Sequence, residues 1–229
     1  MSPSRSSRPF VGGIVDVAPI LLGVFPFGVI AGVAAVDAGL STAQAIAASP
    51  MIFAGASQLA TMDLLSSGSA AAVVIATALV INSRFAMYSA ALSRHLTGLG
   101  GPQRVVAAYL LTDQAFAVSV IRYGRESWDL ASRFAFYLGA AMGLWFTWMV
   151  ATVAGVFVGA GVPPEWSLDF AVPLVFLALL FPAIRDRGTR TAAIVAGSVA
   201  AVAGGLPLNL GLLVAVACGL IAGVAAGRR

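Results

Sequence analysis

The stretch FAFYLGAAMGLWFTWMVATVAGVFVG, residues 134–159, contains no charged side chain. A helix needs about 20 consecutive apolar residues to cross the hydrocarbon core of a bilayer, and this stretch is longer than that. It therefore predicts a transmembrane helix.

The composition extends this prediction to the whole chain of 229 residues. The hydrophobic fraction is 60%, the charged fraction is 10% and the mean hydropathy is +0.97. A soluble domain carries roughly a quarter of its residues as charges. We expect an all-α, polytopic transmembrane helix bundle in which residues 1–229 form one transporter domain embedded in the lipid bilayer.

The basic residues exclude several functions. All thirteen are arginine, so the chain lacks the lysine that a Walker-A ATPase or a Schiff-base enzyme needs. One histidine and one cysteine cannot build a zinc site, and we expect no metal or other cofactor. The pI near 10.0 reflects arginines at helix ends, which orient a membrane protein, and we expect no nucleic-acid partner.

Apolar runs separated by charged residues predict eight spans, with seven as the alternative number. The sixth and seventh runs are short for full crossings. The eight ranges are Phe10–Val36, Thr42–Met62, Ala70–Leu92, Gln103–Ile121, Phe134–Gly159, Phe170–Ile184, Thr191–Leu206 and Leu208–Ala226.

Arginine placement predicts the orientation of these spans, because cytoplasmic flanks carry an arginine excess. With eight spans and the N-terminus inside, only Arg94 and Arg104 lie in outer segments, and Arg84 lies within a span. The other ten arginines are then inside. We expect both termini to be cytoplasmic.

A weak internal repeat relates the two halves, residues 10–121 and 132–226. Pro50-Met51-Ile52-Phe53 resembles Pro173-Leu174-Val175-Phe176, and the same offset carries the first span onto the fifth. Matching broken or short helices in two halves mark the substrate site of many transporters. Pro50 and Pro173 are therefore predicted helix breaks, and the pattern favours a transporter over a membrane anchor.

Four polar residues are predicted to meet inside the membrane. If the third and fourth spans form an antiparallel hairpin, Arg84 lies at the depth of Asp113, and Asn82 lies at the depth of Gln114. Charges are costly at that depth and usually pair. One interpretation is a structural salt bridge; the other, which we prefer, is a substrate or proton site.

The second span should bend at Pro50 and Gly55, because proline removes a helical hydrogen bond and glycine tolerates unusual backbone angles. Freed backbone groups, with Ser57 and Gln58, could then coordinate a small polar ligand; a small-residue packing face is the alternative. Pro26 and Gly28 mark a flexible point in the first span. Trp145 and Trp148 are expected to pack or to face lipid.

Several motifs resemble the AzlC family, in family order and over nearly the whole chain. They are Pro26-Phe27-Gly28-Val29-Ile30-Ala31-Gly32, Phe53-Ala54-Gly55-Ala56-Ser57-Gln58, Asn82-Ser83-Arg84 with Tyr88-Ser89, Leu111-Thr112-Asp113-Gln114-Ala115-Phe116, and Gly205-Leu206-Pro207-Leu208-Asn209-Leu210-Gly211. The block that begins at Phe53 is the most specific. The family commonly has Thr-Asp-Glu where this chain has Thr112-Asp113-Gln114, so a proton-coupling role of that glutamate does not carry over.

The resemblance implies the large subunit of a branched-chain amino acid exporter of the LIV-E type. Such proteins lie in the bacterial inner membrane and work with a small AzlD-type membrane subunit. The sequence leaves two other transport-related roles open, an ABC-type permease subunit and an accessory structural subunit. A third alternative, an intramembrane enzyme acting on lipid, would have to use Ser93-Arg94-His95; we expect no enzyme.

Overall fold

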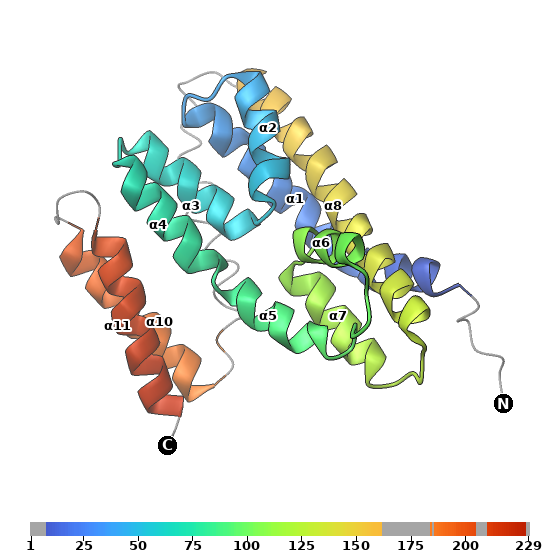
Figure 1. The fold of residues 1–229 in the computed structure, drawn as a ribbon. Coiled ribbons are helices and arrows are strands. Elements are labelled where there is room, and N and C mark those ends of the chain that lie inside the picture. The colour runs from blue at the N-terminus through green and yellow to red at the C-terminus, as the bar shows by residue number, and fades with distance from the viewer. Residues whose placement is uncertain (1–7, 162–183, 185, 205–209, 228–229) are drawn as a thin grey trace.

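The computed structural model describes residues 8–161, 184, 186–204 and 210–227, and every regular element among them is a helix. The predicted all-α bundle is therefore confirmed for the described part of the chain (Figure 1). The sixth predicted span, with Pro173, lies almost entirely outside the described residues. The repeat of residues 10–121 and 132–226 stays a prediction.

The two longest described helices, α1 (Pro9–Asp37) and α8 (Leu130–Gly161), run parallel and lie side by side in Figure 1. Small residues allow this close approach. A Cβ atom on Gly28 would lie 2.7 Å from the Ala151 Cβ, and one on Gly13 would overlap the Phe136 backbone. Since α1 and α8 run in the same direction, both begin at one end of the bundle, here called the near end, and both finish at the far end.

The second predicted span is broken in the middle. Helix α2 (Thr42–Ile52) starts at the far end, and α3 (Gly55–Ser66) follows after Phe53, whose φ of +33° is left-handed. Pro50 and Gly55, the residues at which the sequence predicts a bend, lie on either side of this break. Ala54 precedes α3 in an extended conformation and supplies no side-chain cap.

The third predicted span crosses the bundle. It consists of α4 (Ala71–Asn82) and α5 (Arg84–Ser93), interrupted only at Ser83, and the combined length and hydropathy suit a membrane crossing. Just past its end, the Arg133 guanidinium donates to the His95 carbonyl oxygen over 3.4 Å. The end of α5 and the start of α8 therefore share the near end, so α4 starts at the far end.

The fourth predicted span, Gln103–Ile121, is not one straight helix. Helix α6 (Gly101–Tyr109) and helix α7 (Asp113–Tyr123) are bent by 120° relative to each other. The His95 and Tyr123 rings are 5.4 Å apart, so the chain enters and leaves this segment at the near end. The prediction that Arg94 lies on the opposite side from Arg122 is therefore wrong.

The α2–α3 segment mirrors this arrangement from the far end. It begins after α1 has reached the far end and finishes just before α4 starts there. The two segments meet where each chain turns back: the Tyr109 hydroxyl donates to the Pro50 carbonyl oxygen over 2.8 Å, and the Phe53 and Tyr109 rings are 6.0 Å apart. We call α2–α3 and α6–α7 the half-crossing segments, because each returns to the end of the bundle from which it starts. They contact each other at the points where they turn back, and we call this the tip-to-tip contact.

Among the residues that the structure describes, the number of candidate crossings is lower than the predicted eight. Within the described residues, α1, α4 with α5, and α8 are long and apolar enough to cross a membrane. The α6–α7 pair would be a fourth crossing only if it formed one span, and its two ends lie at the same end of the bundle. Helices α10 (Arg187–Ala203) and α11 (Gly211–Gly227) pack against each other, with Gly219 close to Ala196. Hydropathy cannot distinguish a crossing from a segment that turns back, because both are apolar.

This arrangement predicts which loops share a side of the membrane. In a Cys218→Ala background, Thr97→Cys and Ser127→Cys should react with an impermeant thiol reagent from one side. Ser67→Cys, at the far end, should react from the other side. Labelling of Thr97→Cys and Ser127→Cys from opposite sides would contradict the half-crossing α6–α7 segment.

Candidate functional site

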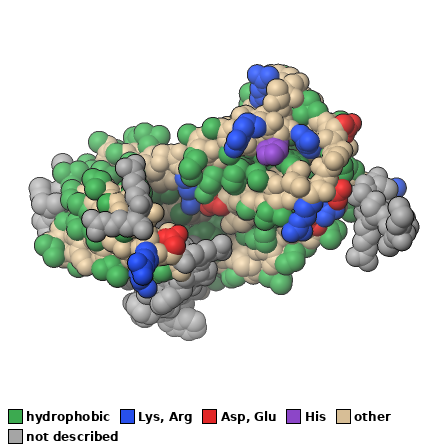
Figure 2. Space-filling model, turned by 90° about the horizontal axis from the view of Figure 1, so that it is seen from below, with side chains coloured by type: hydrophobic (Ala, Val, Ile, Leu, Met, Phe, Trp, Pro, Cys, Tyr) green, Lys and Arg blue, Asp and Glu red, His purple; other side chains and the backbone are tan. Residues whose placement is uncertain are grey.

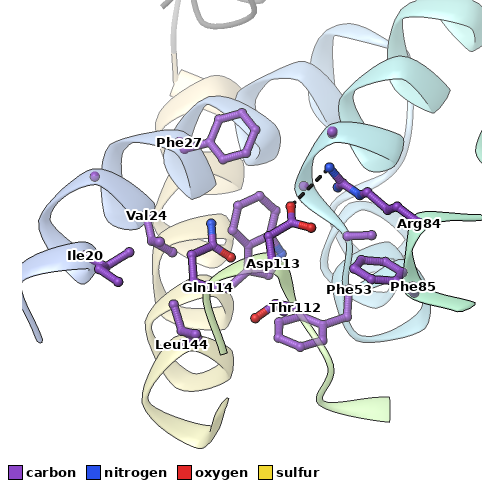
Figure 3. Close-up of a pocket in the computed structure, with 15 residues that line it drawn as sticks. Ile20, Val24, Phe27, Phe53, Arg84, Phe85, Thr112, Asp113, Gln114 and Leu144 are labelled. Carbon is purple, nitrogen blue, oxygen red and sulfur yellow. Dashed lines mark ion pairs between the residues drawn. The ribbon is translucent and has the colours of Figure 1, made fainter. Parts of the chain in front are cut away.

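A cavity of about 500 Å³ lies where the two broken segments meet α1 and α8 (Figure 3). Its size falls within the usual range for small-molecule sites. One wall is the α1 face that carries Ile20, Val24 and Phe27, and Leu144 and Trp148 of α8 lie beside it. The remaining walls come from the α2–α3 break and from the starts of α5 and α7.

Three helices begin at this cavity. Gly55 is the first residue of α3, Arg84 of α5 and Asp113 of α7, and all three line the cavity. The first backbone N–H groups of a helix lack intrahelical partners and carry partial positive charge. In α7 the Thr112 hydroxyl caps one of them by accepting from the Ala115 N–H over 3.2 Å. The starts of α3 and α7 therefore contribute partial positive charge to one side of the cavity, and the Arg84 side chain at the start of α5 lies on the same side.

The predicted ion pair lies on this polar side. Arg84 Nη1 is 3.0 Å from Asp113 Oδ2, and the side chains are 32% and 37% exposed (the dashed line in Figure 3). The Arg84 guanidinium also lies over the Phe85 ring, 5.3 Å from its centroid. Asp113 Oδ1 and Arg84 Nε are buried and make no hydrogen bond within the described part of the chain. Each partner thus retains hydrogen-bonding capacity beyond the pair.

The other predicted polar residues lie differently. Gln114 lines the cavity, whereas Asn82, the last residue of α4, is not among the lining residues. Ser57 and Gln58 are fully buried away from it. The Ser57 hydroxyl donates to the Ala54 carbonyl oxygen over 3.1 Å, and Gln58 Nε2 donates to Ser49 Oγ over 2.9 Å. Ser57 and Gln58 hold the α2–α3 break together, and a substrate-binding role for these residues stays a prediction.

The predicted hinge residues also divide into two groups. Pro50 and Gly55 flank a true break, and a Cβ on Gly55 would come within 2.8 Å of the Trp148 ring. Pro26 and Gly28 lie inside α1, which continues through them. Pro173 lies outside the described residues.

Trp148 is the main cavity residue that the sequence did not indicate. It is 5% exposed, lines the cavity and contacts Phe27 edge to face, with ring centroids 5.5 Å apart. A tryptophan inside an apolar helix carries no signal that separates a packing role from a cavity wall.

The residues of the enzyme alternative do not form a catalytic arrangement. The Ser93 hydroxyl donates to the Ala90 carbonyl oxygen over 2.9 Å, so it is engaged with its own helix. Burial, and then the charges of Arg133 and Arg94, lower the pKa of His95. Among the described residues no three His, Cys, Asp or Glu side chains lie together as a metal site.

The ion pair should couple the stabilities of α5 and α7. Arg84→Gln and Asp113→Asn should each destabilise the protein, and the double variant should lose about 1–2 kcal/mol less than the sum of the two. Equilibrium unfolding by SDS in mixed micelles measures this coupling. Arg104→Gln combined with Asp113→Asn is the control and should be additive; additivity of the Arg84→Gln combination would contradict the pairing.

Comparisons with known proteins find a matching protein family and two similar membrane proteins. Residues 19–162, which contain every residue lining the cavity, match the family model described as AzlC protein. The inner membrane protein YgaZ of Escherichia coli is 26% identical over 96% of this chain and 91% of its own length. A protein of Archaeoglobus fulgidus described as an uncharacterized membrane protein is 33% identical over 99% of the chain and 96% of its own length. No solved structure matches significantly. The chain is a membrane protein that belongs to the AzlC family.

Proposed function

We propose that this protein is a secondary transporter that exports small apolar amino acids of the branched-chain type. The observation that carries the proposal is the cavity itself, which lies between two broken helical segments. In it the ion pair of Arg84 and Asp113, in which one atom of each side chain has no hydrogen-bond partner among the described residues, faces apolar walls. Broken helices that meet within a membrane are the usual setting of a transporter site.

The chemistry of the cavity suits a zwitterion with an aliphatic side chain. Such a substrate needs an acceptor for its ammonium group, and the carboxylate of Asp113, which lines the cavity and is 37% exposed, would supply it. Its carboxylate needs donors, which Arg84 and the uncapped start of α3 would supply. The side chain needs an apolar surface, which Val24 and Leu144 provide. One cavity thus offers a partner for each part of the substrate.

Asp113 is also the candidate for energy coupling. Protonation of its carboxyl group would weaken the attraction to Arg84 and free the guanidinium, and this would link substrate binding to the proton gradient. Gln114 stands where the family commonly has a glutamate, so Asp113 carries this role without an acidic neighbour in the chain. Opening of the cavity to either side would follow from movement of one half-crossing segment against α1 and α8.

The distribution of arginine predicts which end of the bundle faces the cytoplasm. Basic side chains gather around the histidine on the face seen in Figure 2. Arg122 of α7 pairs with Asp16 of α1 over 3.6 Å and with Glu126, also over 3.6 Å, at the near end of the bundle. The positive-inside rule makes this near end, with the N-terminus, cytoplasmic. We therefore place the protein in the cytoplasmic membrane and expect a small AzlD-type subunit as its partner.

Two other roles are less well supported. An ABC-type permease subunit would need an external ATPase and a cytoplasmic surface to receive force, yet the segment between α7 and α8 is short. An accessory structural subunit would have no use for a cavity with an ion pair. Transport by the purified chain with its small partner, in the absence of ATP, would exclude both.

Export from cells loaded with dipeptides tests the proposal, because intracellular hydrolysis supplies each amino acid. Overproduction of the protein should accelerate the efflux of leucine, isoleucine and valine. Asp113→Asn should reduce export by about tenfold or more and abolish its dependence on the pH gradient, because the ammonium acceptor loses its charge. Asp63→Asn, an exposed carboxylate on α3, is the matched control and should leave export unchanged. Unaltered, pH-driven export by Asp113→Asn would remove Asp113 from this role.

A further inference from the structure

Gly23 is the one cavity-lining position on α1 that carries no side chain. Ile20, Val24 and Phe27 line the cavity from the same face of α1, at the spacing of successive helical turns. A Cβ atom built on the exposed Gly23 would meet no atom of the described residues within 4 Å. The missing side chain therefore leaves free space beside the apolar wall.

Packing explains other glycines of the bundle but not this one. A Cβ on Gly28 would lie 2.7 Å from Ala151, so close contact with α8 requires glycine there. Gly55, the other glycine that lines the cavity, stands at the start of α3, and a Cβ atom there would lie 2.8 Å from the Trp148 ring. Gly23 has no positive φ, and no described residue would lie close to its Cβ. Glycine inside a helix is otherwise destabilising, so what Gly23 contributes is open volume.

The position of that volume gives it a specific role. Gly23 precedes Val24 in the α1 wall of the cavity. Figure 3 shows Ile20, Val24 and Phe27 on α1, and the ion pair of Arg84 and Asp113 on the side formed by the helix starts. A zwitterion held by Arg84 and Asp113 would direct its side chain toward α1. We infer that Gly23 determines the largest amino acid side chain the cavity accepts, an inference that rests on the proposed function.

Export measurements on two Gly23 variants test the inference. Gly23→Val should reduce leucine export relative to alanine export by about tenfold or more, the usual effect of filling an apolar subsite. Gly23→Ala should have a smaller effect in the same direction, and it serves as the test if Gly23→Val fails to fold. Gly197→Val is the matched control, because a Cβ there also meets nothing within 4 Å and Gly197 does not line the cavity. An unchanged ratio of leucine to alanine export, or an equal loss of both, would overturn the inference.

Chemical labelling separates this inference from the proposed function. In a Cys218→Ala background, Gly23→Cys should react with a small cationic methanethiosulfonate and resist a bulky dye maleimide, whereas Gly197→Cys should not show this size limit. If no amino acid is exported but the size limit holds, the proposed function fails and Gly23 still sets the limit for another solute. Equal reaction with both reagents, or with neither, would overturn the role of Gly23.

Discussion

Backbone groups freed by a helix break must find partners inside a bilayer, and this constraint organises the whole bundle. Lipid offers no hydrogen bonds, so irregular backbone is tolerated only where protein surrounds it. Here the break after α2 and the turn before α7 lie against each other, and the Pro50 carbonyl oxygen accepts from the Tyr109 hydroxyl of the opposite segment. The Trp145 indole N–H donates in turn to Tyr109 over 3.1 Å, which ties the contact to α8. The α6–α7 segment thus supplies a hydrogen-bond partner to a carbonyl group at the break of the α2–α3 segment.

The chemistry of the cavity follows from this contact. The two broken segments start α3 and α7 at the cavity, and α5 starts there after the interruption of the third predicted span at Ser83. These helix starts bring Arg84 and Asp113 together, each as the first residue of its helix. The long helices α1 and α8 supply the apolar surface. A charged site and an aliphatic wall thus face each other across the cavity.

The sequence predicted the class of the fold and part of the site, for identifiable reasons. Uncharged runs indicated transmembrane helices, and Pro50 with Gly55 indicated the break. Arg84 and Asp113 were predicted to meet as parts of two continuous antiparallel helices, but they meet because helices start at both residues. Hydropathy could not indicate that Gln103–Ile121 turns back. The cap Thr112 followed by Asp113 is a helix-start signal inside that apolar run and could have indicated it. Nothing in the sequence distinguished Trp148 from a packing residue, or Gly23 from a packing glycine.

The tip-to-tip contact is tested most directly by cross-linking in native membranes. With Cys218 replaced by alanine, Phe53→Cys combined with Tyr109→Cys should be joined rapidly by a short bifunctional thiol reagent, because the two rings are 6.0 Å apart. Phe53→Cys combined with Ser127→Cys, at the near end, should remain unlinked. If both pairs stay unlinked while each single cysteine reacts, the two segments do not meet, and the cavity between them does not exist in the membrane.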